Sequence, residues 1–462
     1  MDGDPVIRRF VVLGATGDLA SRQLLPALAR LHEADKLPAE LRIVGAARED
    51  WDTATLRAHM AERLARHAAG TAPASRHAVV SRLVYQRADA SDPADLVRVL
   101  DDVRQPGIVY LALPPSVLEA TVRAVAGLGL ADGSRLVVEK PFGENLASAR
   151  TLNRLLRAAF PETAVFRMDH FLGKQTVQNI LGLRFANRVF EPLWNRSHIA
   201  RVEIIWDETL ALEGRAAYYD SAGALRDMIQ NHLLQLLCLI GMEAPISLSE
   251  RDFRDRKVDV LRAVRRLAPD EVGRRTIRAR YGAGRISDRP VPAYVDEDGV
   301  DPNGETETFA QVRFSIDNWR WAGVPFLLRT GKALARNRRE IAIHFQPVPH
   351  LVFGHETDPT PNTLRLQLDP DRMSLGVNIN GAGDPFELES VELDRDLAAQ
   401  DLSAYARLIL DILEGDPTLS IRGDEAEESW RIVEPILAAW TAERVPLGTY
   451  PAGAAHPAGG TD

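Results

Sequence analysis

Apolar and polar positions along the first part of the chain repeat on two different scales. Short apolar runs predict buried strands over residues 10–13, 41–45, 84–87, 107–113 and 135–139. Between these runs, apolar side chains recur at helical spacing over residues 24–31, 55–66, 93–103 and 117–128. No clear period is present over 74–82. Strands that alternate with helices predict a parallel, doubly wound sheet that binds ligands at the C-terminal ends of its strands.

The pattern changes after about residue 180. Alternation typical of strands with one exposed face covers residues 200–208, 306–316, 340–345, 363–368 and 373–380. Helices are expected over 224–240, 402–414 and 425–444. The predicted fold class is therefore α/β followed by α+β. Residues 1–175 are expected to form a Rossmann-like dinucleotide-binding domain. Residues 176–450 are expected to form a larger, mainly antiparallel domain for substrate binding and oligomerisation, and residues 451–462 a flexible tail.

A glycine-rich turn joins the first predicted strand to the first predicted helix. It reads Gly14-Ala15-Thr16-Gly17-Asp18-Leu19-Ala20, with alanine at the third glycine position of the usual dinucleotide motif. Glycines allow a phosphate to approach the backbone closely, and the helix N-terminus offers N–H groups to a pyrophosphate. A plain tight turn is the alternative, but the strand before it and the helix after it favour a cofactor site.

Arg48 follows the second predicted strand, at the position that distinguishes the two nicotinamide cofactors. An acidic residue there suits the ribose 2′-hydroxyl of NAD, whereas arginine suits the 2′-phosphate of NADP, to which Thr16 could add a hydroxyl. Glu49 and Asp50 come next, so NAD stays open as a weaker alternative. A solvated arginine at a strand end is the plainer interpretation.

Composition sharpens the search for functional residues. Of 56 basic residues only five are lysines, namely Lys36, Lys140, Lys174, Lys257 and Lys332. A lysine retained in such a chain favours a place where a compact, titratable point charge is needed. The net charge of −9 argues against a general nucleic-acid partner. The single cysteine, Cys238, excludes a disulfide framework and a cysteine-rich metal site.

Location follows from the apolar pattern. No apolar run reaches 18 residues, so no membrane partner is expected. The first ten residues carry no secretory apolar segment, which predicts a cytoplasmic protein.

Two polar stretches carry candidate chemistry. Asp169-His170-Phe171-Leu172-Gly173-Lys174 places an acid, an imidazole and a lysine within six residues, with His170 and Lys174 able to face one anion. Metal binding is a rival interpretation, but no further ligands occur at suitable spacing, so no metal is expected. Asp227 and His232 interrupt an otherwise apolar helix. A buried polar group needs a partner or a role, and a satisfied core histidine is the plain alternative.

These stretches resemble the glucose-6-phosphate 1-dehydrogenase family from the first strand to about residue 445. The similarity rests on residues 14–20, 110–115, 138–143, 167–174, 226–235 and 329–332. It implies oxidation of D-glucose 6-phosphate at C1 to 6-phospho-D-glucono-1,5-lactone with NADP, the first step of the oxidative pentose phosphate pathway. It also implies a homodimer or homotetramer.

The resemblance also implies roles for individual residues. His232 is the implied general base for the C1 hydroxyl, and Asp169 the carboxylate that orients it. Implied substrate contacts are Lys140, His170, Lys174, Glu208, Asp227 and Lys332. Implied cofactor contacts are Gly14, Ala15, Thr16, Gly17, Asp18, Leu19, Arg48, Pro114 and Lys140.

Three positions depart from the family pattern. Gln23 and Asn337 stand where basic residues are common, and Phe171 replaces the more usual tyrosine. These departures leave open a related sugar-phosphate or NAD-linked sugar dehydrogenase on the same fold. A non-catalytic NADP-binding regulator is a further alternative, against which the presence of both His232 and Asp169 argues.

Overall fold

The computed structural model describes residues 7–100, 105–212, 214, 216–353, 359–383, 386–398 and 400–459. The chain divides into two compact units. The first unit contains Met1–Gln175, Pro245–Asp255 and Gln400–Glu427, and the second contains Thr176–Ala244, Arg256–Ala399 and Glu428–Asp462. The second unit is therefore not the continuous stretch 176–450 expected from the sequence, because two of its stretches belong to the first unit.

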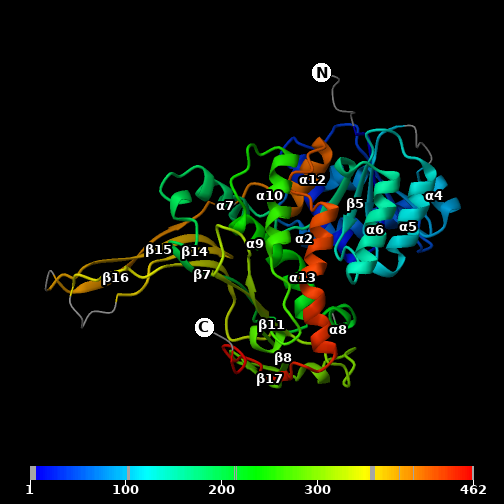
Figure 1. The fold of residues 1–462 in the computed structure, drawn as a ribbon. Coiled ribbons are helices and arrows are strands. Elements are labelled where there is room, and N and C mark those ends of the chain that lie inside the picture. Colours follow the sequence, from blue (N-terminus) through cyan, green and yellow to red (C-terminus); the bar gives the residue numbers. More distant parts are fainter. Residues whose placement is uncertain are drawn as a thin grey trace. The chain divides into compact units, whose positions relative to one another are not determined.

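Within the described ranges, the first unit contains a six-stranded parallel sheet (Figure 1). Its order is β3 (Leu83–Arg87), β2 (Arg42–Ala47), β1 (Arg9–Leu13), β4 (Ile108–Leu111), β5 (Arg135–Glu139) and β6 (Val165–Met168). Strands covered by helices on both faces read as continuous apolar runs, which is why five of these strands, all except β6, could be located from the sequence. The predicted doubly wound Rossmann-like fold is confirmed.

Helices cover this sheet. They are α1 (Leu25–Glu33), α2 (Thr53–His67), α3 (Pro73–Ser81), α4 (Pro93–Val99), α5 (Pro115–Leu128), α6 (Leu146–Ala159) and α12 (Ala404–Glu414). Helix α12 packs on α1 and adds its apolar side chains to the core of the sheet, which explains why a distant stretch of sequence belongs to this unit. Helices α10 (Glu250–Ala263) and α13 (Gly423–Thr441) begin in the first unit and end in the second.

The described part of the second unit contains a nine-stranded mixed sheet. Its order is β16 (Leu388–Asp396), β15 (Asp371–Asn380), β14 (Thr363–Leu368), β13 (Arg338–Phe345), β7 (Ile199–Asp207), β12 (Pro325–Gly331), β11 (Phe309–Ser315), β8 (Thr276–Gly282) and β17 (Leu447–Pro451). Neighbours are antiparallel except β7 with β12 and β8 with β17. The mainly antiparallel sheet is confirmed. A small hairpin pairs β9 (Gly284–Ile286) with β10 (Arg289–Val291).

The long helix predicted over 224–240 has an unexpected winding. Helix α8 (Ala216–Ala224) leads into η4 (Leu225–Leu233), which is π-helical, and α9 (Leu234–Gly241) continues it as an α-helix. This unit also contains helix α7 (Gln175–Phe185) and the short helix α11 (Val272–Arg275). No helix in the described ranges has the length and apolar character that crossing a membrane requires.

Two further expectations need correction. Residues 74–82, which showed no period, lie largely in helix α3, which begins at Pro73 and buries only Ser75 and Val79. The expected tail is ordered through residue 459, the last one described. Ala452 is buried, and Gly453 N–H donates to the carbonyl of Ala333 at 2.8 Å. Backbone hydrogen bonds, which composition does not reveal, hold this segment in place.

Candidate active site

The glycine-rich turn lies between β1 and the π-helical start of its helix, η1 (Ala20–Leu24). Gly14 has a φ of +89°, and a Cβ at this position would lie 2.2 Å from the carbonyl oxygen of Ala112. Gly14 N–H donates to Ala46 O at 2.8 Å, and Gly17 N–H donates to Gly14 O at 3.1 Å. Only glycine fits this conformation at this approach to Ala112, so the tight turn requires glycine at this position.

A cavity of about 440 Å³ opens at this turn. Its walls come from the residues that follow β1, β2, β3 and β4, where a doubly wound sheet binds ligands. The predicted cofactor residues that line it are Gly14, Thr16, Gly17, Arg48 and Pro114. Ala15, Asp18, Leu19 and Lys140 are not among its lining residues. Sequence reasoning missed Asp89 and Ser91, which line the cavity just after β3; their place at a strand end was the available signal.

Charges of both signs surround Arg48 in this cavity. The hydroxyl of Thr16 donates to Oε2 of Glu49 at 3.0 Å, and Tyr85 donates its hydroxyl to the Glu49 carbonyl at 2.6 Å. Hydrogen bonds from Ser91, together with the Arg48 charge, lower the pKa of Asp89. One exposed arginine and two carboxylates, those of Glu49 and Asp89, thus line the cavity at the place where a ribose would bind.

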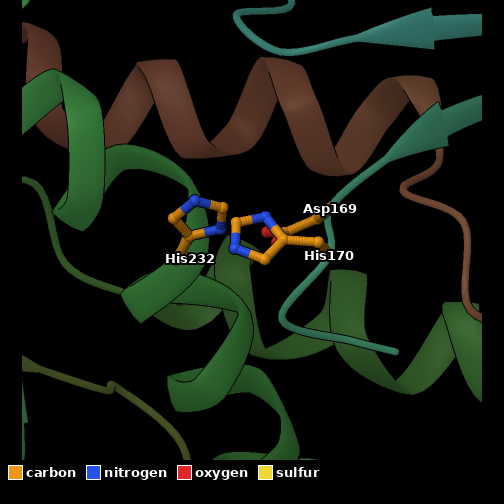
Figure 2. A group of neighbouring side chains, drawn as sticks. All are labelled: Asp169, His170 and His232. Atoms are coloured by element: carbon orange, nitrogen blue, oxygen red, sulfur yellow. The ribbon is translucent and has the colours of Figure 1, made fainter. Parts of the chain in front are cut away.

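Asp169 and His170 begin a tight turn directly after β6, where Figure 2 shows both side chains. Asp169 is buried, and its Oδ1 accepts the backbone N–H of Phe171 at 3.0 Å. The turn continues with Lys174 N–H donating to Phe171 O at 3.1 Å. A Cβ on Gly173 would lie 2.4 Å from Ala404 O, so glycine is required where this turn meets α12.

Aromatic rings contact the side chains of His170 and Lys174 in this turn. The Lys174 ammonium lies 5.2 Å from the centre of the Phe171 ring, and His170 packs on the same ring edge-on at 5.1 Å. On its other side, His170 stacks on Tyr405 with ring centres 5.8 Å apart and planes inclined by 13°. Two groups that can carry positive charge therefore share one aromatic ring.

Tyr405 connects this turn to the end of β5. Its hydroxyl donates to Oε1 of Glu139 at 3.5 Å, and Tyr110 donates to the same oxygen. Burial raises the pKa of Glu139 to about 7, although the tyrosine hydroxyls and the Lys140 charge act against the shift. The Lys140–Pro141 peptide bond is cis. Sequence reasoning missed Tyr405 because 266 residues separate it from Glu139.

His232 lies on η4 in the second unit, where Figure 2 shows its imidazole. The imidazole is buried, and the neighbouring Asn231 accepts the His232 backbone N–H at 2.6 Å and donates to Arg226 O at 2.9 Å. The start of η4 is held by Glu307, whose Oε1 accepts Leu225 N–H at 2.9 Å. Burial raises the pKa of Glu307.

Glu208 and Lys332 leave the ends of two paired parallel strands, β7 and β12. The Lys332 ammonium donates to Glu208 Oε2 at 2.9 Å and lies 5.2 Å from the centre of the Tyr219 ring. Burial, with the nearby carboxylate of Asp227, raises the pKa of Tyr219 well above its ordinary value. The predicted substrate residues Glu208, Asp227 and Lys332 therefore gather around one buried tyrosine.

The three departures from the family pattern have different surroundings. Asn337 Oδ1 accepts the backbone N–H of Thr209 at 2.9 Å, so it anchors the segment after Glu208. Besides Lys332, a second basic group contacts Glu208: Nη2 of Arg339 lies 3.3 Å from Glu208 Oε1. Phe171 is buried beneath His170 and Lys174, and Gln23 is exposed.

A cavity in the described second unit lies away from these residues. It measures about 810 Å³ and is lined by Arg184, Glu191 and the fully exposed Trp319, among others. None of the predicted site residues lines it. Arg184 has a structural role there, because its guanidinium donates hydrogen bonds to the carbonyls of Leu239 and Met242 at the end of α9. Cavity size therefore does not locate the chemistry in this unit.

The fold and these side chains together indicate the class of protein. A Rossmann-type sheet with a glycine turn and an arginine at the ribose position binds a nicotinamide dinucleotide, and a second unit carries a buried histidine, carboxylates and a lysine. This combination is that of a dinucleotide-dependent dehydrogenase.

Comparison with known proteins gives the family. The model "Glucose-6-phosphate dehydrogenase, NAD binding domain" matches residues 11–179, and "Glucose-6-phosphate dehydrogenase, C-terminal domain" matches residues 181–462. The chain belongs to the glucose-6-phosphate dehydrogenase family, which confirms the resemblance seen in the sequence.

Individual relatives match over almost their whole length. Glucose-6-phosphate 1-dehydrogenase of Treponema pallidum (strain Nichols) is 44% identical, covering 98% of this chain and 92% of that protein. The enzyme of Mycolicibacterium smegmatis is 42% identical, covering 97% and 94%. A solved glucose-6-phosphate dehydrogenase in complex with its substrate glucose-6-phosphate superimposes with a TM-score of 0.89 at 32% identity, covering 99% of this chain and 97% of that one.

Proposed function

We propose that this protein oxidises D-glucose 6-phosphate at C1 to 6-phospho-D-glucono-1,5-lactone and reduces NADP, the first step of the oxidative pentose phosphate pathway. Membership of the family over nearly the whole chain is the observation that carries this proposal. The cofactor cavity supports it, because it opens at the glycine turn and Arg48 offers a cation to a 2′-phosphate there. NADP, when bound, supplies the hydride acceptor.

The roles of the side chains follow from their chemistry. His232 takes the proton from the C1 hydroxyl, and Asp169 orients the imidazole and stabilises its positive charge. Loss of that proton makes hydride loss from C1 easier, and a positioned base typically contributes about 10²–10⁴-fold. Because histidine has an ordinary pKa near neutrality, it is suited to this transfer at physiological pH.

The remaining predicted residues bind and orient the sugar phosphate. His170 and Lys174 hold the phosphate, which the shared aromatic support of their turn favours. Glu208, Asp227 and Lys332 bind the sugar hydroxyls, and Lys140 contacts both sugar and cofactor. The phosphate is remote from C1, so its binding energy can be used to position the reacting carbon.

The test is reduction of NADP⁺ followed at 340 nm with glucose 6-phosphate, and with unphosphorylated glucose in parallel. We expect turnover with the phosphate ester, and a loss on the order of 10²–10⁴-fold in kcat for His232→Ala. His77→Ala removes an exposed histidine of the first unit and should leave turnover unchanged. Cofactor binding without turnover on glucose 6-phosphate would overturn the substrate assignment and would direct attention to other sugar phosphates.

We also propose a cytoplasmic homodimer or homotetramer. The expected subunit mass is 51.0 kDa, so sedimentation equilibrium distinguishes the states directly. A single 51 kDa species at working concentration would contradict the oligomer.

A further inference from the structure

Lys332 reaches Glu208 from a turn that is constrained at every residue. The turn spans residues 331–335, after β12. A Cβ on Gly331 would lie 2.7 Å from the Phe309 ring, and Ala333 has a φ of +51°, which is rare for a residue with a side chain. The Lys332 ammonium lies at the end of a flexible four-carbon stem, so its position depends on how firmly this turn is held.

One side of the turn is held by the segment that follows β7. Glu208 N–H donates to Gly331 O at 2.8 Å, and Ala333 N–H donates to Leu210 O at 2.9 Å. Leu334 N–H then donates to the Glu208 carbonyl at 3.0 Å. These bonds connect the two residues whose side chains form the Lys332–Glu208 ion pair.

The other side is held by the C-terminal segment, residues 447–459. The Tyr450 hydroxyl donates to the Lys332 carbonyl at 2.6 Å. Gly453 N–H donates to Ala333 O at 2.8 Å, and Ala335 N–H donates to Ala454 O at 2.9 Å. Three residues of the turn, Lys332, Ala333 and Ala335, are thus bonded to a segment more than 100 residues away in the sequence.

The C-terminal segment is itself held rigidly. Tyr450 is 1% exposed and lies on β17, opposite Tyr281 of β8. Its hydroxyl lies 2.9 Å from Thr308 Oγ1, which accepts the N–H of Tyr281 at 3.0 Å. Gly453 has a φ of +87°, and a Cβ there would lie 1.9 Å from Arg285 O, so glycine is required. A chain of hydrogen bonds therefore runs from β8, the strand next to the edge of the sheet, to the Lys332 carbonyl.

We infer that the C-terminal segment is a positioning element of the sugar-binding site, and that Tyr450 is the positioning residue that fixes Lys332. This inference rests on the proposed role of Lys332 in binding the sugar phosphate. Without the Tyr450 hydroxyl, the Lys332 carbonyl loses its partner in a buried place and the turn gains freedom. Loss of order at Lys332 weakens sugar-phosphate binding. The residues that line the cofactor cavity all belong to the first unit, so cofactor binding is unchanged.

The test is Tyr450→Phe, which removes only the hydroxyl. We expect the KM for glucose 6-phosphate to rise on the order of 10-fold, with the KM for NADP unchanged and kcat changed less than the KM. Gly453→Ala displaces the segment by another route and should raise the same KM. The matched control is Tyr281→Phe in the strand opposite, where the residue is as little exposed as Tyr450 and the hydroxyl bonds to Glu297 at 2.9 Å.

The outcomes separate the two proposals. If Lys332→Met leaves the KM for glucose 6-phosphate unchanged, the proposed role of Lys332 fails. If Lys332→Met raises that KM but Tyr450→Phe does not, the positioning role of Tyr450 is overturned alone. Equal rises for Tyr450→Phe and Tyr281→Phe would mean a general structural effect, and would also overturn it.

Discussion

Gly223 lies at the junction between α8 and the π-helix that carries His232, and replacing it with alanine should disturb both stability and turnover. Its φ and ψ are 71° and 169°, a conformation that is available almost only to glycine. A Cβ at this position would lie 2.6 Å and 2.8 Å from the two carboxylate oxygens of Glu307. One of these oxygens accepts the Leu225 N–H at the start of η4.

The magnitude follows from two costs. Holding alanine in such a backbone conformation costs about 1–3 kcal/mol. Displacing the Glu307 carboxylate forfeits a hydrogen bond to a charged group, about 1.5–3 kcal/mol. Since domains have net stabilities of about 5–15 kcal/mol, a loss of roughly 3 kcal/mol is a large fraction. At about 2–4 °C per kcal/mol, the Tm of the second unit should fall by roughly 6–12 °C.

Two assays check this prediction. Thermal unfolding followed by circular dichroism gives the change in Tm, and NADP⁺ reduction at 25 °C gives kcat. We expect kcat to fall on the order of 10²-fold, because a shift of about 1 Å in a catalytic group has that effect. The control is Gly182→Ala in α7, where a Cβ meets open space. Since alanine is the better helix former, that variant should gain about 0.5–1 kcal/mol and keep its activity.

A Gly223→Ala protein that unfolds at the parent temperature and turns over at the parent rate would refute the reasoning. It would mean that the Glu307 carboxylate does not fix the start of η4. A variant that is destabilised but keeps full kcat at 25 °C would contradict only the link from this junction to His232.

Three further predictions concern the first unit. Glu49→Gln should raise the ratio of kcat/KM for NADP over NAD by about 10-fold, because it removes a negative charge beside the 2′-phosphate position. Parallel kinetics with both cofactors measure this ratio. Tyr405→Ala should raise the KM for glucose 6-phosphate roughly 3–10-fold, whereas Tyr405→Phe, which keeps the ring that stacks on His170, should not. Burial raises the pKa of Glu139 from 4.5 to about 7. Because the folded protein then binds this proton more tightly than the unfolded chain does, the free energy of unfolding falls as the pH rises from 4.5 to about 7. In urea unfolding, the stability of Glu139→Gln relative to the parent should therefore be greater at pH 8 than at pH 5, and a difference that does not change with pH would show that Glu139 titrates normally.

Local sequence determined much of the first unit and the motifs of the site. Continuous apolar runs marked five of its strands, and the strand before Gly14 together with the helix after it indicated the cofactor turn. The stretch from Asp169 to Lys174 was informative for the same reason, because its residues interact within one turn. Helix α3 was missed because its buried side chains are too few to produce a period.

Tertiary structure alone decided how these motifs are supported. The start of η4 is bonded to Glu307, which lies 82 positions from the Leu225 N–H that it accepts. Tyr405 reaches Glu139 across 266 positions, and Tyr450 reaches Lys332 across 118. Composition suggested a flexible end for the chain, yet residues 451–459 complete the turn that carries Lys332. Periodicity and turn chemistry act over a few neighbouring residues, whereas these contacts form only when the sheets bring distant strands together, so the sequence by itself could not reveal them.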